Sequence, residues 1–263
     1  MTEQASEGSP ERSDAEGTPR EIRHEYTLNW GPILAHLGAT LLVSTYQAGK
    51  LVVASAARDG KGLDLAYRNF EKAMGVAVAP GKIAVGTRDM IWTLADAPEI
   101  ASRLDPPGAR DACFLTRSAH VTGEIAGHEM AFANDDLWVI NTLFSCVCTI
   151  SPRFSFVPRW RPWFITEYAP EDRCHLNGLA LWEGRPKFVT AMAQTDTKGG
   201  WRPNKATSGV LIDVTTDRVV LEGLAMPHSP RIHAGAVWVL DSGRAAGALG
   251  GLVSGSGPTV AFL

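Results

Sequence analysis

Two histidines, an asparagine and a carboxylate occupy corresponding places in a repeated pattern of this sequence. His128, Asn177 and His228 each stand at the start of a segment of alternating apolar residues, and Glu129 follows His128 directly. Imidazole, amide and carboxylate groups that converge on one cavity can hold a divalent metal ion, or provide an acid and a base with suitable pKa values. We therefore predict His128, Glu129 and His228 as catalytic residues, and His128, Asn177 and His228 as metal ligands.

Further polar residues near these positions are candidates for ligand binding. A polar segment, residues 193–208, interrupts the repeated pattern, and loops on a rigid scaffold often carry binding groups. The predicted ligand-binding residues are His175, Asn177, Arg231, Trp201, Asn204 and Lys205. The expected partner is a small polar molecule, bound directly or through a divalent metal.

The sequence contains none of several well-known catalytic motifs. There is no G-x-S-x-G elbow, no P-loop and no G-x-G-x-x-G, and His128-Glu129 does not continue as H-E-x-x-H because position 132 is Phe132. Whether the protein is an enzyme therefore stays open. If it is one, a hydrolase or lyase is favoured over an oxidoreductase, with a histidine as general base and a metal or Arg231 stabilising negative charge.

The candidate residues begin the units of an internal repeat. These units are MGVAVAPGKIAVGT from Met74, HEMAFANDDLWVINT from His128, NGLALWEGRPKFVTA from Asn177 and HSPRIHAGAVWVLDS from His228. Each unit has two β-rich runs around a turn, and successive units begin 54, 49 and 51 residues apart, close to the roughly 40–50 residues of a propeller blade. A partial copy at residues 40–45 matches the second strand of the unit. Alternating strands also resemble one another in any all-β protein, but here the phase is kept through four copies.

The predicted fold class is all-β, a β-propeller-like repeat of four-stranded meander blades. About five blades or parts of blades are visible, so the ring is expected to be incomplete. The first strand of a propeller blade lines the central channel, and its N-terminal end opens on the face where ligands usually bind. That geometry would bring the four leading residues together. The alternative is that these polar residues only hydrate a wet channel.

Two other groups of residues are expected to be structural. The ends of the second strands are small or polar and should form hydrogen-bonded corners, at Ser44-Thr45, Gly86-Thr87, Asn141-Thr142, Thr190-Ala191 and Asp241-Ser242. Cys146 and Cys148 face one side of a strand and could bind a soft metal together with Cys174 and His175. We favour packing between sheets for these thiols, because small apolar thiols are common there.

Composition limits the classes of partner. The chain has 263 residues, 45% of them hydrophobic, and a formal charge of −3 without a basic run, so we expect no nucleic acid. The basic and aromatic residues 153–164 are interpreted as part of an inter-blade loop. No stretch of 18 apolar residues occurs, which predicts no membrane span and a cytoplasmic location. We expect a disordered leader at 1–21, a propeller-like domain at 22–243, and a low-complexity or frame-shifted tail at 244–263.

Six separated segments resemble the bacterial DUF4915 family in order and spacing. They are LLVSTYQAGKLVV, SAHVTGEIAGHEMAF, FSFVPRWRPWFI, APEDRCHLNGLAL, TDTKGGWRPNKATSGVLIDV and MPHSPRIHAGAVWVLDSG, within about residues 25–243. The resemblance implies a propeller-like repeat and the family motifs H-E-M, C-H-L-N-G and P-H-S-P-R, here at 128–130, 174–178 and 227–231. It implies no particular activity. Family members resemble this chain up to the D-S-G segment but then continue with further blades. We therefore expect this sequence to be a truncated gene product, and the alternative is a genuinely shorter protein.

Three hypotheses about function follow. In the first, the channel mouth binds a small polar ligand. In the second, the domain is a scaffold that holds a partner protein with the propeller face and the Trp201 insertion. In the third, the chain is a truncated, nonfunctional fragment.

Overall fold

A computed structural model describes residues 24–245 and 260–262 of the chain. The predicted leader at 1–21 lies outside these residues, as does most of the predicted tail. The helices are α1 (Trp30–Leu37), α2 (Pro98–Ala101), the 3-10 helix η1 (Arg202–Asn204) and α3 (Ser242–Ala245). None of the described helices is long and apolar enough to cross a membrane.

Almost all other regular structure is β. The strands are β1 (Leu41–Thr45), β2 (Lys50–Ala56), β3 (Leu63–Asn69), β4 (Val76–Ala79), β5 (Lys82–Gly86), β6 (Met90–Asp96), β7 (Phe114–Val121), β8 (Gly127–Ala133), β9 (Asp136–Asn141), β10 (Cys146–Ser151), β11 (Phe154–Trp160), β12 (Leu176–Trp182), β13 (Arg185–Ala191), β14 (Gly209–Asp213), β15 (Arg218–Leu224), β16 (Pro227–His233), β17 (Ala236–Asp241) and β18 (Val260–Phe262). Four antiparallel sheets have the orders β18-β1-β2-β3, β4-β5-β6-β7, β8-β9-β10-β11 and β12-β13-β14-β15, and β16 pairs with β17.

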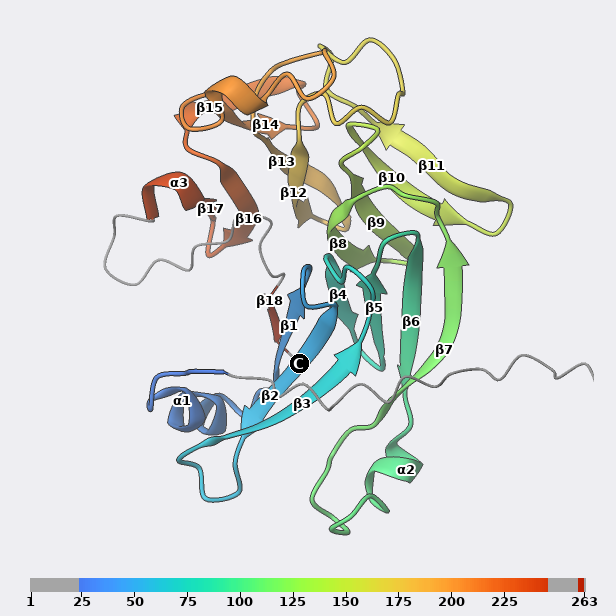
Figure 1. Cartoon of the computed structure of the whole chain (residues 1–263), viewed down its shortest axis with the longest axis vertical. Helices are drawn as coiled ribbons and strands as arrows, with labels where there is room; N and C mark the ends of the chain where they lie inside the picture. Colours follow the sequence, from blue (N-terminus) through green and yellow to red (C-terminus); the bar gives the residue numbers. More distant parts are fainter. Residues whose placement is uncertain (1–23, 246–259, 263) are drawn as a thin grey trace, which may run out of the picture.

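The sheets follow one another around a common centre in sequence order (Figure 1). The first strand of each repeat unit is the innermost strand of its sheet, and the inner strands β4, β8, β12 and β16 are successive neighbours. This arrangement is a β-propeller-like ring of meander blades, which confirms the predicted fold class. It also places the N-terminal ends of the inner strands, where the candidate residues lie, around the centre.

The four repeat units share one backbone feature that confirms their alignment. Two residues before each leading residue the backbone is left-handed, with φ of 51° at Lys72, 47° at Ala126, 50° at His175 and 54° at Met226. A side chain at positive φ is strained, so its recurrence in four blades marks a turn that the fold requires. This turn leads the chain into each inner strand and sets the direction in which the leading residue enters the centre.

The partial copy in the first sheet is completed from the other end of the chain. β1 has the second position in its sheet, as the sequence predicts, and β18 pairs with its inner edge, with Leu41 opposite Phe262 and Val43 opposite Val260. β18 also lies beside β4. The inner strand of this blade is therefore supplied by residues 260–262, within the segment for which the sequence predicts only a low-complexity or frame-shifted tail.

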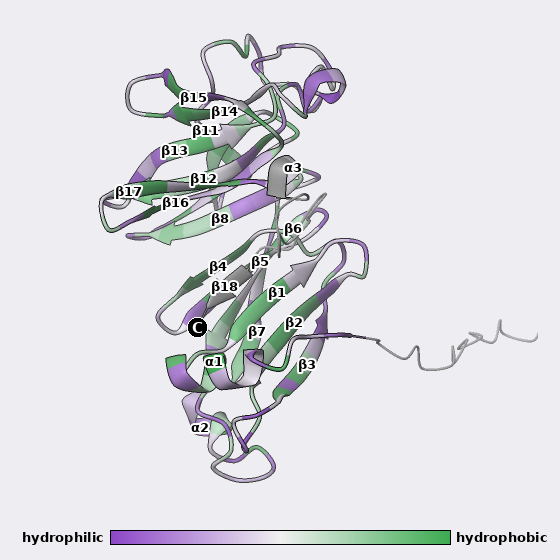
Figure 2. Ribbon diagram, turned by 90° about the vertical axis from the view of Figure 1, so that its left-hand side faces the viewer, coloured by the Kyte–Doolittle hydropathy of each residue, from purple (hydrophilic) through white to green (hydrophobic). Residues whose placement is uncertain are grey.

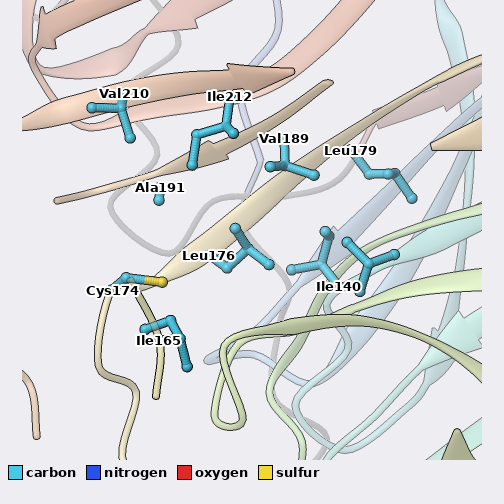
Figure 3. Packing of buried hydrophobic residues seen from close by; sticks show 10 residues of the cluster. Ile140, Ile165, Cys174, Leu176, Leu179, Val189, Ala191, Val210 and Ile212 are labelled. Carbon is cyan, nitrogen blue, oxygen red and sulfur yellow. The ribbon is translucent and has the colours of Figure 1, made fainter. Parts of the chain in front are cut away.

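Three hydrophobic cores lie between neighbouring sheets, whose strands are rich in apolar residues (Figure 2), and a smaller one lies between α1 and the first sheet. Between the third and fourth sheets, Ile140 packs with Leu176 and Val189 (Figure 3), and Val147 belongs to the same core; all four are fully buried. Because each core between sheets is built by two blades, a blade is stable only beside its neighbour. The inner strands are held in place from both sides.

The cysteines are packing residues, as favoured from the sequence. All four are free thiols. Cys146 and Cys148 are buried in the core between the second and third sheets, whereas Cys174 belongs to the core between the third and fourth. The thiols of the C-x-C pair therefore do not share a core with Cys174.

One outer strand differs from the sequence prediction and another has no counterpart in it. β11 occupies most of the expected inter-blade loop, and β7 lies outside the predicted repeat units. Both are fourth strands at the outside of a sheet, with mostly exposed or half-buried side chains. An outer strand does not have to pack on both of its faces. Its sequence therefore lacks the regular apolar pattern that identifies inner strands.

Candidate functional site

Three histidines from neighbouring blades meet at the N-terminal ends of the inner strands. His128 and His228 are the second residues of β8 and β16, and His175 directly precedes β12. The rings of His128 and His175 lie 4.8 Å apart, centroid to centroid, at an angle of 78°. His175 is also near enough to His228 to contribute to the lowering of the pKa of His228. The structure thus brings together three of the predicted site residues.

The hydrogen bonds of His128 determine which of its nitrogens carries a hydrogen. Nδ1 lies 3.0 Å from the carbonyl oxygen of Ala126 and 2.7 Å from Oγ1 of Thr142. Thr142 donates its only hydroxyl hydrogen to the carbonyl oxygen of Leu176, at 2.6 Å. Both neighbours of Nδ1 must therefore accept, so Nδ1 is the donor. In the neutral ring, Nε2 then carries the lone pair.

His228 repeats this arrangement two blades later. Its Nδ1 lies 2.9 Å from the carbonyl oxygen of Met226 and 3.1 Å from Oγ of Ser242. Thr142 and Ser242 each follow their histidine by 14 residues and stand at the end of the second strand. The carbonyl requires Nδ1 to donate, which again leaves Nε2 as the basic nitrogen of the neutral ring.

His175 is held by a carboxylate and an indole. Its Nδ1 lies 3.0 Å from both carboxylate oxygens of Asp172, and its ring is 4.2 Å from the ring of Trp201. The indole nitrogen of Trp201 donates to Asp172 at 3.1 Å. Asp172 therefore fixes both rings, and a carboxylate on Nδ1 orients the imidazole as in catalytic dyads.

Burial keeps two of the histidines neutral. Burial, together with the nearby His175 and His228, lowers the pKa of His128 from 6.5 to about 3, although the Ala126 carbonyl opposes this shift. Burial also lowers the pKa of His228. Two neutral imidazoles with their Nδ1 atoms engaged present Nε2 as a hydrogen-bond acceptor, a base or a metal ligand.

Asn177 has the corresponding position in the fourth blade. It is buried, and its Oδ1 accepts a hydrogen bond of 2.6 Å from Oγ1 of Thr190. Its Nδ2 has no hydrogen-bond partner among the described residues. Gly178 leaves room for this packing, since a Cβ there would lie 2.2 Å from Oγ1 of Thr190 and 2.4 Å from Cδ of Pro230. Asn177 is thus a buried amide donor at the same ring of positions.

A charged network fixes the loop that carries Asp172 and His175. The guanidinium of Arg173 is almost buried and contacts Glu167 at 2.5 Å, Glu171 at 2.9 Å and Asp196 at 3.0 Å. These bonds raise the pKa of Arg173, mainly through Asp196 and Glu167. Asp196 also accepts from the backbone and hydroxyl of Thr166. Arg173 therefore ties the loop before β12 to the insertion that contains Trp201.

Glu129 and Arg231 form an ion pair across the inner strands. Oε1 of Glu129 lies 2.5 Å from Nη1 of Arg231, and Oε2 accepts 2.7 Å from the backbone nitrogen of Leu179. Burial raises the pKa of Glu129, an effect opposed by Arg231 and by the Leu179 amide. The pair belongs to the wall of the central cavity and joins β8, β12 and β16.

The remaining predicted ligand-binding residues have different surroundings. Trp201 is buried against His175 and so belongs to the histidine cluster. Asn204 and Lys205 are exposed on and after η1, and Asn204 lines a separate hollow beside β14. Lys205 contributes only its carbonyl oxygen, which accepts from the backbone of Met226. The described residues contain no group of three His, Cys, Asp or Glu side chains arranged to hold a metal ion.

Three residues of this cluster were not singled out from the sequence. Thr142 and Ser242 were grouped with the structural corners, and Asp172 was not assigned a role. Their signal was weak, because Thr and Ser are common at strand ends and acidic residues are common in loops. The constant spacing of 14 residues from histidine to hydroxyl was the one feature that could have indicated Thr142 and Ser242.

Several solved structures align with most of this chain at low sequence identity. Glutaminyl cyclase of Myxococcus xanthus is 14% identical, with a TM-score of 0.42 over 75% of this chain and 79% of that one. A streptogramin B lyase is 12% identical, with a TM-score of 0.43 over 76% and 72%. Virginiamycin B lyase of Staphylococcus aureus is 9% identical, with a TM-score of 0.41 over 76% of this chain and 58% of that one. No curated protein sequence matches this chain significantly.

The family of the chain is given by a sequence profile. The profile of DUF4915, described as a domain of unknown function, matches residues 28–260. The match includes the three histidines and most of the segment after residue 243. The chain therefore belongs to the DUF4915 family.

Proposed function

We propose that the histidine cluster at the channel mouth binds a small polar ligand. The observation that carries this proposal is that three imidazoles, His128, His175 and His228, come from three neighbouring blades and are each fixed through Nδ1. The bonds at Nδ1 set the orientation of each ring, so Nε2 is the ring nitrogen that can contact a ligand. Such fixed, convergent polar groups are typical of small-molecule sites.

Hydration of a channel alone would not require these features. A histidine that only contacts water keeps its pKa near the ordinary value, whereas burial lowers the pKa of both His128 and His228. Burying imidazoles costs stability, and the buried Nδ2 of Asn177 adds an unsatisfied donor at the equivalent position. Polar groups that are costly for folding are frequently retained because a ligand uses them.

The donors and acceptors at the mouth define the class of ligand. Neutral imidazoles with hydrogen on Nδ1 offer Nε2 as acceptors, and Asn177 offers an amide hydrogen. A molecule that carries both O–H or N–H groups and a carbonyl or hydroxyl acceptor satisfies both kinds of group. The pair Asp172 and His175 adds a base that could take a proton from such a group. If the site is catalytic, this favours hydrolysis or elimination, with His175 as general base.

A divalent metal is the alternative route to the same ligand. It would use Nε2 of His128 and His228 with the amide of Asn177, and the bonds at Nδ1 would serve as the outer support usual for metal-bound histidines. We favour direct binding, because a neutral histidine cluster with an amide donor is complementary to a polar organic molecule without an added ion.

The scaffold hypothesis has less support. It relied on Trp201 in the insertion, and that side chain is 7% exposed and packed on His175. A buried indole cannot serve as the anchor of a partner protein without rearrangement. The insertion instead forms one wall of the histidine cluster.

Ligand binding can be tested with a panel of small polyols, amides, amino acids and amines. Thermal shift would identify binders and isothermal calorimetry would give their affinities, with and without EDTA or added Zn2+. We expect a binder whose affinity falls at least about tenfold in His175→Gln and in His228→Gln. His233→Gln is the matched control, because His233 is exposed at the other end of β16.

Three outcomes separate the interpretations. Loss of binding in the cluster variants but not in the control supports the proposed site. Loss of binding after EDTA supports the metal route. If no member of the panel binds, or if His233→Gln weakens binding as much as the cluster variants do, the proposed site is wrong.

A further inference from the structure

The central cavity of the ring is separate from the histidine cluster in its chemistry. It has a volume of about 500 Å3 and is lined by residues of the inner strands β4, β8, β12 and β16. That volume is within the range of small-molecule sites, about 300–1,000 Å3. Glu129 and Arg231 are its only charged lining residues within the described chain, and the others are apolar, including Val78, Phe132 and Leu181.

Arg231 has guanidinium donors with no hydrogen-bond partner among the described residues. All of its hydrogen bonds within the described chain are made by Nη1, to Glu129 at 2.5 Å, to the carbonyl of Pro230 at 2.8 Å and to that of Leu179 at 3.5 Å. Its side chain is 49% exposed. Nε and Nη2 form one edge of the guanidinium, and this edge matches the two oxygens of a carboxylate.

Glu129 holds the guanidinium in place from the opposite strand. Its side chain is 7% exposed, and its second oxygen accepts from the backbone of Leu179. The carboxylate is therefore anchored to β12 while it pairs with Arg231 on β16. An arginine oriented in this way loses little freedom when it binds an anion, although the negative charge of Glu129 weakens the attraction.

We propose that the central cavity binds an organic anion with an apolar body, whose carboxylate pairs with Nε and Nη2 of Arg231. The apolar part of the ligand contacts the aliphatic and aromatic lining. This site does not rest on the histidine cluster, which has a different donor set and lies at the N-terminal ends of the inner strands. Failure of either proposal therefore leaves the other intact.

Octanoate is a suitable probe, with octan-1-ol as the neutral molecule of the same length. Calorimetry on the full chain should show octanoate binding at least about tenfold more tightly than octan-1-ol. Arg231→Met should abolish that preference, and Arg231→Lys should reduce it, because lysine keeps the charge but loses the planar edge. Glu129→Gln should strengthen octanoate binding, because it removes the competing charge and keeps an acceptor for Leu179.

Two controls make the result decisive. Arg218→Met changes an exposed arginine at the start of β15 and should leave octanoate binding unchanged. The double variant Glu129→Gln with Arg231→Met removes both charges together, so it tests recognition where the single Arg231→Met fails to fold. The proposal is overturned if octanoate does not bind, if octan-1-ol binds equally well, or if the double variant keeps the preference for octanoate.

Discussion

At the scale of single residues, the hydroxyl of Thr142 determines which ring nitrogen of neutral His128 carries the hydrogen and which one is basic. Because the one hydroxyl hydrogen is used on the Leu176 carbonyl, Nδ1 of His128 must donate, and the basic nitrogen of the neutral ring is Nε2. A threonine at a strand end thus has a consequence for the site that its residue type does not suggest. Ser242 occupies the corresponding place beside Nδ1 of His228, where the Met226 carbonyl fixes the direction of the bond.

The lowered pKa of His128 predicts a loss of stability in mild acid. The folded-state pKa, about 3, is below the ordinary value of 6.5 expected in the unfolded chain, so the unfolded state binds more protons between these values. Above about pH 6.5, His128 is neutral in both states and does not reduce the free energy of unfolding. As the pH falls toward 3, the free energy of unfolding decreases by at most about 1.4 kcal/mol per pH unit. Urea unfolding at pH 7.5, 6.0 and 5.0 measures this slope.

The variants His128→Gln and His233→Gln show whether His128 is responsible. His128→Gln should reduce the slope of stability against pH, because glutamine does not titrate. His233→Gln, at an exposed position, should leave the slope as in the unchanged chain. An equal slope in all three proteins would contradict a His128 that stays neutral in the folded chain.

At the scale of elements, the site depends on two loops as well as on the inner strands. Asp172 and His175 come from the loop before β12, and Trp201 comes from the insertion between β13 and β14. Arg173 joins these loops through Glu171 on one side and Asp196 on the other. Strand pairing cannot position such residues, so the charged network performs this role.

Replacing Arg173 by methionine should loosen both loops without unfolding the ring. The backbone amide of Thr166 bonds to Asp196, and that of Gly199 bonds to the carbonyl of Glu171. We expect hydrogen exchange at these two amides to become at least about tenfold faster, because Asp196 and Glu171, whose carboxylate and backbone carbonyl accept from them, lose their common side-chain partner. Arg88→Met is the control, since the exposed side chain of Arg88 pairs with the exposed carboxylate of Glu71. Unchanged exchange in Arg173→Met would show that the loops are held by other contacts.

At the scale of the whole molecule, the cores between blades couple each sheet to the next. Ile140 of the third sheet is fully buried among residues of the fourth. A chain whose three larger described cores lie between neighbouring sheets should unfold cooperatively through those interfaces. This property also bears on the fragment hypothesis, because a nonfunctional fragment would lack a cooperative transition.

Ile140→Ala should lower the free energy of unfolding by about 2–5 kcal/mol while the transition remains single. The loss reflects removed apolar contacts and the cavity that remains between the third and fourth sheets. Val237→Ala on β17 is the control and should change stability little, because Val237 is 42% exposed. Chemical denaturation followed by tryptophan fluorescence and circular dichroism checks both. Two separate transitions, or a cost below that of the control, would contradict coupling through this core.

The sequence by itself determined the repeat, the inner strands and the ring of leading residues. Inner strands are packed on both sides, so their apolar alternation and their turns are strong signals, and the spacing of the units is that of propeller blades. His128, Asn177 and His228 were identified because they stand at one position of that repeat. The same reasoning was weaker for β7 and β11, whose outer position demands no regular pattern.

Only the tertiary structure decided how these residues are grouped. Local sequence shows neither that residues 260–262 complete the first blade nor that Trp201 packs on His175 and bonds to Asp172, because these contacts join segments far apart in the chain. It also shows neither the tautomer of His128, set by Thr142, nor the pairing of Glu129 with Arg231 inside the cavity. Hydrogen-bond direction and burial arise from three-dimensional neighbours, so the chemistry of the site follows from the fold and not from residue type alone.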